Sequence, residues 1–243
     1  MKKVARAQEW ARRLDAELPQ VFKNPLTRWR MKKLMASSEA QLRQDLFVLA
    51  TLKFRKRGFF VEFGATNGRS LSNTFLLEKK FGWQGILAEP ARFWHDNLLA
   101  NRTCSIDKRC VWTSTGDEIR FRETEVQHLS TILDYVGSDK HTARRQTGID
   151  YLVETVTLED LLRTHRAPKH IDYLSIDTEG TELSILESFD FSKRSFDVIT
   201  VEHNNTEQRN GIKQVLEGNG YRRVFEDITL WDDWYLSQDL ERA

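Results

Sequence analysis

Acidic residues and glycines accompany the apolar runs of this 243-residue chain at positions where they can bind a ligand. The apolar run Phe59–Phe63 contains Glu62 and is followed by Gly64 and Gly68. A second acid, Glu89, ends the next apolar run. Glycine lets the backbone turn sharply and approach a ligand closely, and a carboxylate can accept hydrogen bonds from both hydroxyls of a ribose. The pattern predicts a nucleoside-binding strand–turn–helix–strand unit.

The glycine spacing separates two classes of nucleotide ligand. A dinucleotide pyrophosphate favours the pattern G-x-G-x-x-G, whereas this chain has Gly64 and Gly68 four residues apart, with Glu62 just before them. Glu62 would repel a pyrophosphate and attract a cationic cofactor such as S-adenosylmethionine. Two alternatives stay open. One is an ordinary strand-to-helix turn without a ligand, and the other is a nicotinamide-dependent oxidoreductase, because Glu89 lies 21 residues after Gly68.

A second acidic group follows two later apolar runs. Asp177 and Glu179 come after one run, and Glu202 and His203 end the next. Adjacent parallel strands lie about 4.8 Å apart, so these side chains are expected to surround one small volume. Asp177, Glu202 and His203 would suit Mg²⁺ or Mn²⁺. Alternatively, His203 or Glu179 would act as a general base without a metal, while Asp177 could instead cap the following helix.

Strand and helix patterns alternate along the chain and would position these residues. Strands are expected at 59–63, 85–88, 110–112, 171–176 and 196–201, and helices at 70–81, 91–101, 158–165, 182–189 and 206–219. A terminal antiparallel pair is expected at 221–228 and 231–236, an excursion strand at 119–122, and a mobile loop or lid at 123–150. Repeated strand–helix units predict an α/β fold with a parallel sheet. The acidic residues would then lie at the carboxyl ends of its strands, where such sheets bind ligands.

Charge is unevenly distributed. Residues 1–58 hold 15 Lys and Arg against 5 Asp and Glu, and the rest holds 22 against 31. The stripe of Trp10, Leu14 and Leu18 and a helix over 38–57 make the basic segment a helical extension. It would pair with the acidic body, stay solvated, or dock an anionic membrane surface or a phosphorylated carrier. Nucleic acid is disfavoured because no recognised binding motif accompanies the charge.

No run is long and apolar enough for a transmembrane helix, and the first residues do not resemble a signal peptide. We therefore expect a cytoplasmic protein, peripheral to the inner face of a membrane if the basic segment docks there. Cys104 and Cys110 are expected to be free thiols. Association into a homo-oligomer stays open.

Taken in order, the motifs resemble those of the FkbM-type S-adenosylmethionine-dependent methyltransferases over roughly residues 45–237. The matching segments are VEFGATNG at 61–68, AEP at 88–90, TLEDLL at 157–162, IDTEGTE at 176–182 and VE at 201–202. The resemblance implies a Rossmann-like class I methyltransferase fold, with a mostly parallel seven-stranded sheet, helices on both faces and a C-terminal antiparallel strand. The predicted division is a basic helical extension, 1–57, and an S-adenosylmethionine-binding domain, 58–243.

The resemblance also implies an O-methyltransferase that acts on a hydroxyl group, often of a sugar in a glycan, polysaccharide or glycosylated metabolite. Carried over by position, the residues that line the methionine end of the cofactor are Glu62, Gly64, Ala65, Asn67 and Gly68. Glu89 would hold the ribose, Trp112 would flank the adenine, and Asp177 and Glu179 would face the transferred methyl group. The remaining alternative is a non-catalytic scaffold that keeps the methyltransferase fold.

Overall fold

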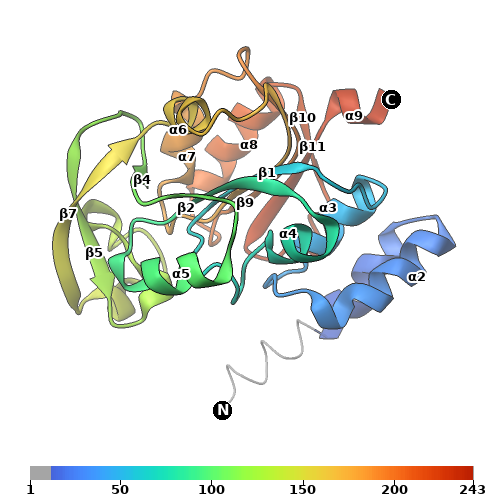
Figure 1. Cartoon of the computed structure of the whole chain (residues 1–243), viewed down its shortest axis with the longest axis horizontal. Helices are drawn as coiled ribbons and strands as arrows, with labels where there is room; N and C mark the ends of the chain where they lie inside the picture. Colours follow the sequence, from blue (N-terminus) through green and yellow to red (C-terminus); the bar gives the residue numbers. More distant parts are fainter. Residues whose placement is uncertain (1–11, 243) are drawn as a thin grey trace.

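A seven-stranded, mostly parallel sheet forms the centre of the protein, for which a computed structural model describes residues 12–242 (Figure 1). Its strand order is β10-β11-β9-β8-β1-β2-β3. The strands are β1 (Phe59–Phe63), β2 (Gln84–Ala88), β3 (Ser105–Asp107), β8 (His170–Ile176), β9 (Ser195–Glu202), β10 (Tyr221–Val224) and β11 (Asp232–Ser237). β11 runs antiparallel to both of its neighbours, β9 and β10. The predicted sheet, including its C-terminal antiparallel strand, is confirmed.

Helices cover both faces of this sheet. Successive residues of a strand point to opposite faces, and in β1 Phe60 packs into one buried cluster and Val61 into another. Residues of α3 and α4 complete the first cluster, and residues of α6, α7 and α8 complete the second. The helices are α2 (Pro25–Leu34), α3 (Gln44–Thr51), α4 (Phe75–Phe81), α5 (His95–Asn101), α6 (Leu158–Thr164), α7 (Glu182–Ser188), α8 (Gln208–Gly218) and α9 (Gln238–Arg242).

Local signals set where two of these helices begin. The Asn24 side chain accepts a hydrogen bond from the Leu26 N–H at 2.8 Å, and Pro25 is the first residue of α2. Thr157 accepts from the Asp160 N–H at 3.1 Å and opens α6. Both ends follow the usual preference for Asn or Thr at the N-cap and for proline at the first helical position.

The basic N-terminal segment shares a core with the rest of the protein. Its first eleven residues, including Trp10, lie outside the described part of the chain. Leu14, Leu18 and Met31 are buried in the same cluster as residues of α3 and β1. The helix predicted over 38–57 is shorter, because Arg43 takes a left-handed φ of 61° just before α3. Across residues 12–242, no helix is long and apolar enough to cross a membrane.

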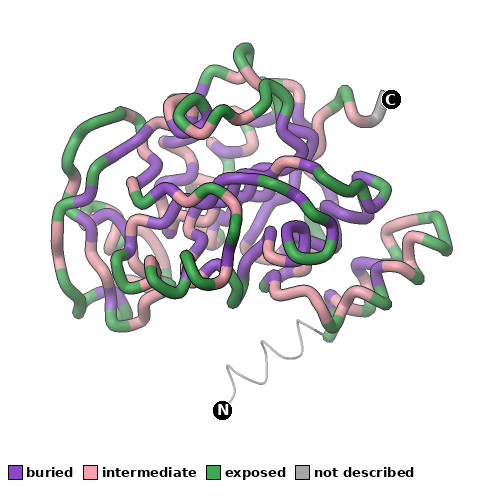
Figure 2. The backbone as a smooth tube through the Cα atoms, viewed as in Figure 1, coloured by how far each residue is buried: buried purple, intermediate pink, exposed green. Residues whose placement is uncertain are grey.

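A second sheet, with the order β4-β7-β5-β6, stands beside the first. Its strands are β4 (Cys110–Val111), β5 (Glu118–Thr124), β6 (Thr131–Ile132) and β7 (Gly148–Val156). Figure 2 shows many exposed residues along its outer edge, whereas the central strands are mainly buried. One expectation is corrected here: the strand predicted at 110–112 pairs with β7, and β3 takes the third position of the central sheet. The segment 123–150, predicted as a loop or lid, begins in β5 and ends in β7, and between them it holds β6 and short 3₁₀ turns.

Candidate active site

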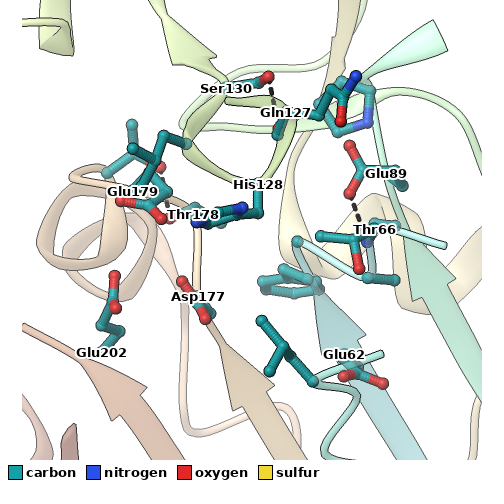
Figure 3. Close-up of a pocket in the computed structure, with 18 of the residues that line it drawn as sticks. Glu62, Thr66, Glu89, Gln127, His128, Ser130, Asp177, Thr178, Glu179 and Glu202 are labelled. Carbon is teal, nitrogen blue, oxygen red and sulfur yellow. Dashed lines mark hydrogen bonds between the residues drawn. The ribbon is translucent and has the colours of Figure 1, made fainter. Parts of the chain in front are cut away.

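A cavity of about 690 Å³ opens at the carboxyl ends of β1, β2, β8 and β9 (Figure 3). Its floor carries the acids predicted from the sequence, and its cover is formed by β5, β6 and the segment 127–144. Apolar side chains that line it include Phe63, Val111, Phe121 and Ile132. The volume and the mixture of apolar walls with a few convergent polar groups are typical of a small-molecule site.

The Gly64 turn holds three strand ends together. Gly64 has a φ of +69°, and a Cβ atom built on it would lie 1.8 Å from the carbonyl oxygen of Asp177, which follows β8. The Gly64 N–H donates to the Ala88 carbonyl of β2 at 3.1 Å. No side chain fits between these backbones, so glycine is required for the close approach of β1 and β8.

Glu89 is buried beside this turn, and its carboxylate can still accept further hydrogen bonds. Its two oxygens accept from the Thr66 N–H at 2.7 Å and the Ala91 N–H at 2.8 Å. Burial raises the pKa of Glu89 to about 7, and the charge of Asp177 adds to this effect. Each carboxylate oxygen keeps a lone pair for a further donor. Glu89 can therefore bind a diol at the cavity wall.

Glu62 lines the cavity but uses its carboxylate to hold a turn. Its oxygens accept from the Asn73 N–H at 2.8 Å, the Ser72 hydroxyl at 3.0 Å and the Thr74 hydroxyl. These bonds explain why α4 begins at Phe75 rather than at residue 70, because the residues before it are fixed on Glu62. Glu62 therefore acts on the cavity through the 72–74 turn.

Asn73 is a cavity residue that the sequence analysis did not identify. Its side-chain nitrogen donates to the Ser175 hydroxyl at 2.9 Å, whereas its buried Oδ1 has no hydrogen-bond partner among the described residues. A buried acceptor without a partner is costly unless a ligand satisfies it. The cavity wall therefore offers an acceptor suited to a ligand N–H, such as an ammonium group. An isolated asparagine in a predicted helix gives no signal for such a role.

Three carboxylates converge at the ends of β8 and β9. One oxygen atom from each of Asp177, Glu179 and Glu202 lies within 4.8 Å of the others. Burial, followed by the charge of Glu182, raises the pKa of Asp177 to about 7. Burial and the charge of Asp177 raise the pKa values of Glu179 and Glu202 well above their usual range. We call these three residues the acid cluster.

Two buried side chains shape the acid cluster. Glu182 accepts hydrogen bonds from the Thr178 N–H at 2.9 Å and the Gly180 N–H at 3.1 Å, which fixes the loop that carries Glu179. Arg145, in the cover, pairs with Glu179 and with Asp139, the latter at 2.8 Å. The cover is therefore linked to the cluster by a buried cation, which offsets part of its negative charge.

His203 does not reach the cavity, which corrects its predicted roles as metal ligand and base. Its Nδ1 accepts from the Asn205 N–H at 3.0 Å, and its Nε2 lies 3.6 Å from Asp233 Oδ1. Glu202 is the last residue of β9, and the next side chain is directed to the opposite face. Glu179 takes the third position in the cluster instead.

Three residues carried over as cofactor ligands also lie outside the cavity lining. Asn67 accepts from the N–H groups of Arg69 and Ser70 at 2.9 and 2.8 Å, so it shapes the turn. Gly68, with a φ of +74°, packs against Leu98 and Arg102. Trp112 packs edge-on against Tyr135 with ring centroids 5.8 Å apart. Glu62, Gly64, Ala65 and Glu89 do line the cavity.

The two cysteines are free, as predicted. Cys110 lies in the cavity wall. Burial raises the pKa of its thiol to about 12, which favours the neutral thiol over the nucleophilic thiolate.

A ligand cavity at the carboxyl edge of a mostly parallel seven-stranded sheet, with one antiparallel strand near the C-terminus, defines a Rossmann-like methyltransferase architecture. Residues 62–223, more than half of the chain, match the family model described as methyltransferase FkbM domain. The chain therefore belongs to the FkbM methyltransferase family.

Two solved structures illustrate the similarity. The FkbM methyltransferase from Methylobacillus flagellatus KT is 12% identical with a TM-score of 0.47, over 97% of this chain and 60% of that one. The precorrin-6y C5,15-methyltransferase from Geobacter metallireducens GS-15 is 11% identical with a TM-score of 0.42, over 74% of this chain and 71% of that one. This chain thus spans 60% of the length of the Methylobacillus protein. No curated protein matches the sequence.

Proposed function

We propose that this methyltransferase transfers a methyl group from S-adenosylmethionine to a hydroxyl group of a sugar, in a glycan, polysaccharide or glycosylated metabolite. One observation carries the proposal. The Asp177 backbone carbonyl approaches the Gly64 turn, while the Asp177 carboxylate belongs to the acid cluster. A single residue therefore links the predicted nucleoside side of the cavity to the group that can act on a hydroxyl.

The residues present fit a cationic nucleoside. Glu89 would accept from the ribose hydroxyls, and the Asn73 Oδ1, which lacks a partner, would accept from the ammonium group. The nearby carboxylates favour a positive ligand over a pyrophosphate. When bound, S-adenosylmethionine supplies a methyl group already activated by its positive sulfur.

The acid cluster would hold and deprotonate the acceptor hydroxyl. A carboxyl group with a pKa of about 7, as for Asp177, is suited to take up a proton near neutral pH. The three carboxylates also fit Mg²⁺ or Mn²⁺, because both cations prefer oxygen ligands and would offset the mutual repulsion of the cluster. A divalent cation there would lower the pKa of the hydroxyl.

The proposal includes a docking surface on α2. Leu26 and Trp29 are exposed by 60% and 53%, three residues apart on the helix. Basic residues of the same helix are Arg28, Arg30, Lys32 and Lys33. Exposed apolar side chains beside Lys and Arg are typical of a helix that lies in an anionic membrane surface. This supports an anionic bilayer, rather than a phosphorylated carrier, as the proposed partner of the basic segment, with the enzyme at the cytoplasmic face of that membrane.

Two binding titrations and one variant test the methyltransferase proposal. Calorimetry should show binding of S-adenosylmethionine and none of NAD; binding of neither would favour a scaffold, and binding of NAD alone an oxidoreductase. Transfer of a labelled methyl group to a panel of glycans should then fall at least about 100-fold in Asp177→Asn, the usual scale for losing a general base. Unchanged donor affinity in that variant is expected, and full turnover would refute the role of Asp177.

A further inference from the structure

Basic side chains line the cavity opposite the acid cluster. They come from the cover and are His128, Lys140, His141 and Arg144. Figure 3 shows the His128 ring projecting from the cover into the cavity, between the acid cluster and Glu89 in that view. The floor of the cavity is therefore acidic and its cover is basic. Lys140 and Arg144 are exposed to solvent, and we call the part of the cover that carries them the mouth of the cavity.

Two of these basic side chains have no ionic partner within residues 12–242. Across residues 12–242, neither Lys140 nor Arg144 lies within salt-bridge distance of a carboxylate, and both are exposed. The contrast with Arg145 is direct, because that neighbour is fully buried between Asp139 and Glu179. Arg145 therefore stabilises the fold through its ion pairs, whereas the preceding residue, Arg144, remains exposed at the cavity mouth.

The basic groups act on one another and on an aromatic wall. His128 and Arg144 both line the cavity from the cover, and burial together with the charge of Arg144 lowers the pKa of His128. The Lys140 ammonium lies 5.8 Å from the centroid of the Trp231 ring. Trp231 also lines the cavity, and its carbonyl accepts from the His203 and Asn204 N–H groups directly after β9. The mouth therefore combines positive charge with a flat apolar surface on which a sugar ring can pack.

We propose that the sugar acceptor carries an anionic group, specifically a phosphate ester, which Lys140 and Arg144 bind at the cavity mouth while its hydroxyl reaches the acid cluster. This inference rests on the proposed function and narrows its substrate class. Arginine binds phosphate oxygens through two parallel N–H bonds, and lysine adds a point charge. A phosphate dianion takes both cations better than a single carboxylate does.

The separation of the acidic floor from the basic mouth would also determine the orientation in which the acceptor binds. A phosphate at the floor would face the carboxylates of Asp177, Glu179 and Glu202, whose negative charge would repel it. A phosphate at the mouth meets Lys140 and Arg144 instead. The same arrangement would therefore favour a phosphorylated sugar bound with its hydroxyl inward and disfavour the reverse orientation.

The test compares three ligands that differ in one group: a hexose 6-phosphate, the matching hexuronate and the neutral methyl hexoside. Binding of each to the protein saturated with S-adenosylhomocysteine is measured by ligand-observed NMR and calorimetry. The double variant Lys140→Ala/Arg144→Ala removes the proposed anion site. Arg163→Ala/Lys193→Ala is the matched control, because those side chains are also exposed and lie outside the cavity.

We expect the phosphate to bind the wild type and the control equally, and the double variant at least about tenfold more weakly, since a charged hydrogen bond contributes roughly tenfold or more. Equal phosphate affinity in the double variant, or tighter binding of the neutral hexoside, would overturn the proposal. Tighter binding of the hexuronate would overturn the phosphate assignment and support a carboxylate at the same cations. Affinity for S-adenosylmethionine is measured in each variant. Failure of the wild type to bind it would refute the proposed function, whereas donor binding without phosphate discrimination would refute only this inference.

Discussion

Replacing Gly64 with alanine should separate the two strands that build the site. A non-glycine residue at a φ of +69° costs about 1–2 kcal/mol. The new Cβ would lie 1.8 Å from the Asp177 carbonyl oxygen, and relieving such a collision by a backbone shift costs about 1–3 kcal/mol. Gly64→Ala should therefore lower the free energy of unfolding by about 2–5 kcal/mol.

Gly82 offers a matched control because its backbone conformation is nearly the same. Its φ is +66°, and apart from its chain neighbours no atom of residues 12–242 lies within 4 Å of a Cβ built there. Gly82→Ala should therefore show only the conformational cost, about 1–2 kcal/mol. Urea unfolding of both variants, followed by tryptophan fluorescence, measures the difference that belongs to the contact with Asp177.

The same variants should differ in donor binding. Gly64→Ala must move β1 away from β8, so its affinity for S-adenosylmethionine should fall at least about tenfold by calorimetry, while Gly82→Ala should bind as the wild type does. Equal stability loss in the two variants would refute the rigid contact between Gly64 and Asp177. Unchanged donor affinity in Gly64→Ala would refute the position of the donor beside that turn.

Three further perturbations address the acid cluster and α2. The pKa of Asp177 is raised from 3.8 to about 7, so the folded state loses stability as pH rises between these values. Asp177→Asn should therefore raise the free energy of unfolding by about 1–3 kcal/mol at pH 8, and by less at pH 5. A lower free energy of unfolding of the variant at pH 8 would contradict the burial of this charge. Mn²⁺ should raise the unfolding temperature of the wild type but not of Glu202→Gln, and exhaustive chelation should reduce turnover. Full turnover after chelation would leave Asp177 as a metal-free base. Leu26→Ser/Trp29→Ser should weaken binding to anionic vesicles, measured by co-sedimentation, at least about tenfold. The control Ile149→Ser, which alters a side chain 68% exposed on β7, should bind as the wild type does. An equal loss of vesicle binding in both variants would contradict a docking role for α2.

The central sheet is predictable because its strands are mostly apolar and buried on both faces. β1 and β8 carry few polar residues and are buried along nearly their whole length, as expected for strands covered by helices on each side. Their acidic ends are therefore predicted at one edge, and the structure places Glu62, Glu89, Asp177 and Glu202 around a common cavity.

The sequence predicts the cover only in part. The excursion strand expected at 119–122 lies within β5, whereas β7, which is largely exposed at its start, is not predicted and is stabilised by pairing with β5 along seven positions. Arg145 lies in this region, so its ion pair with Glu179 has no local signal. The predicted role of His203 is wrong for a different reason, because the side chain after Glu202 faces away from the cavity. The roles of Asn73 and Arg145 come from tertiary contacts alone.

The most direct test of the central claim is the affinity for S-adenosylmethionine of the wild type and of Glu89→Ala, measured by calorimetry. Glu89 contacts the Gly64 turn through Thr66 and faces the cavity with free acceptor capacity. We expect saturable binding of one donor per chain in the wild type and at least about tenfold weaker binding in Glu89→Ala. Absence of binding in the wild type, or equal binding in both proteins, would contradict a donor held at this edge of the sheet.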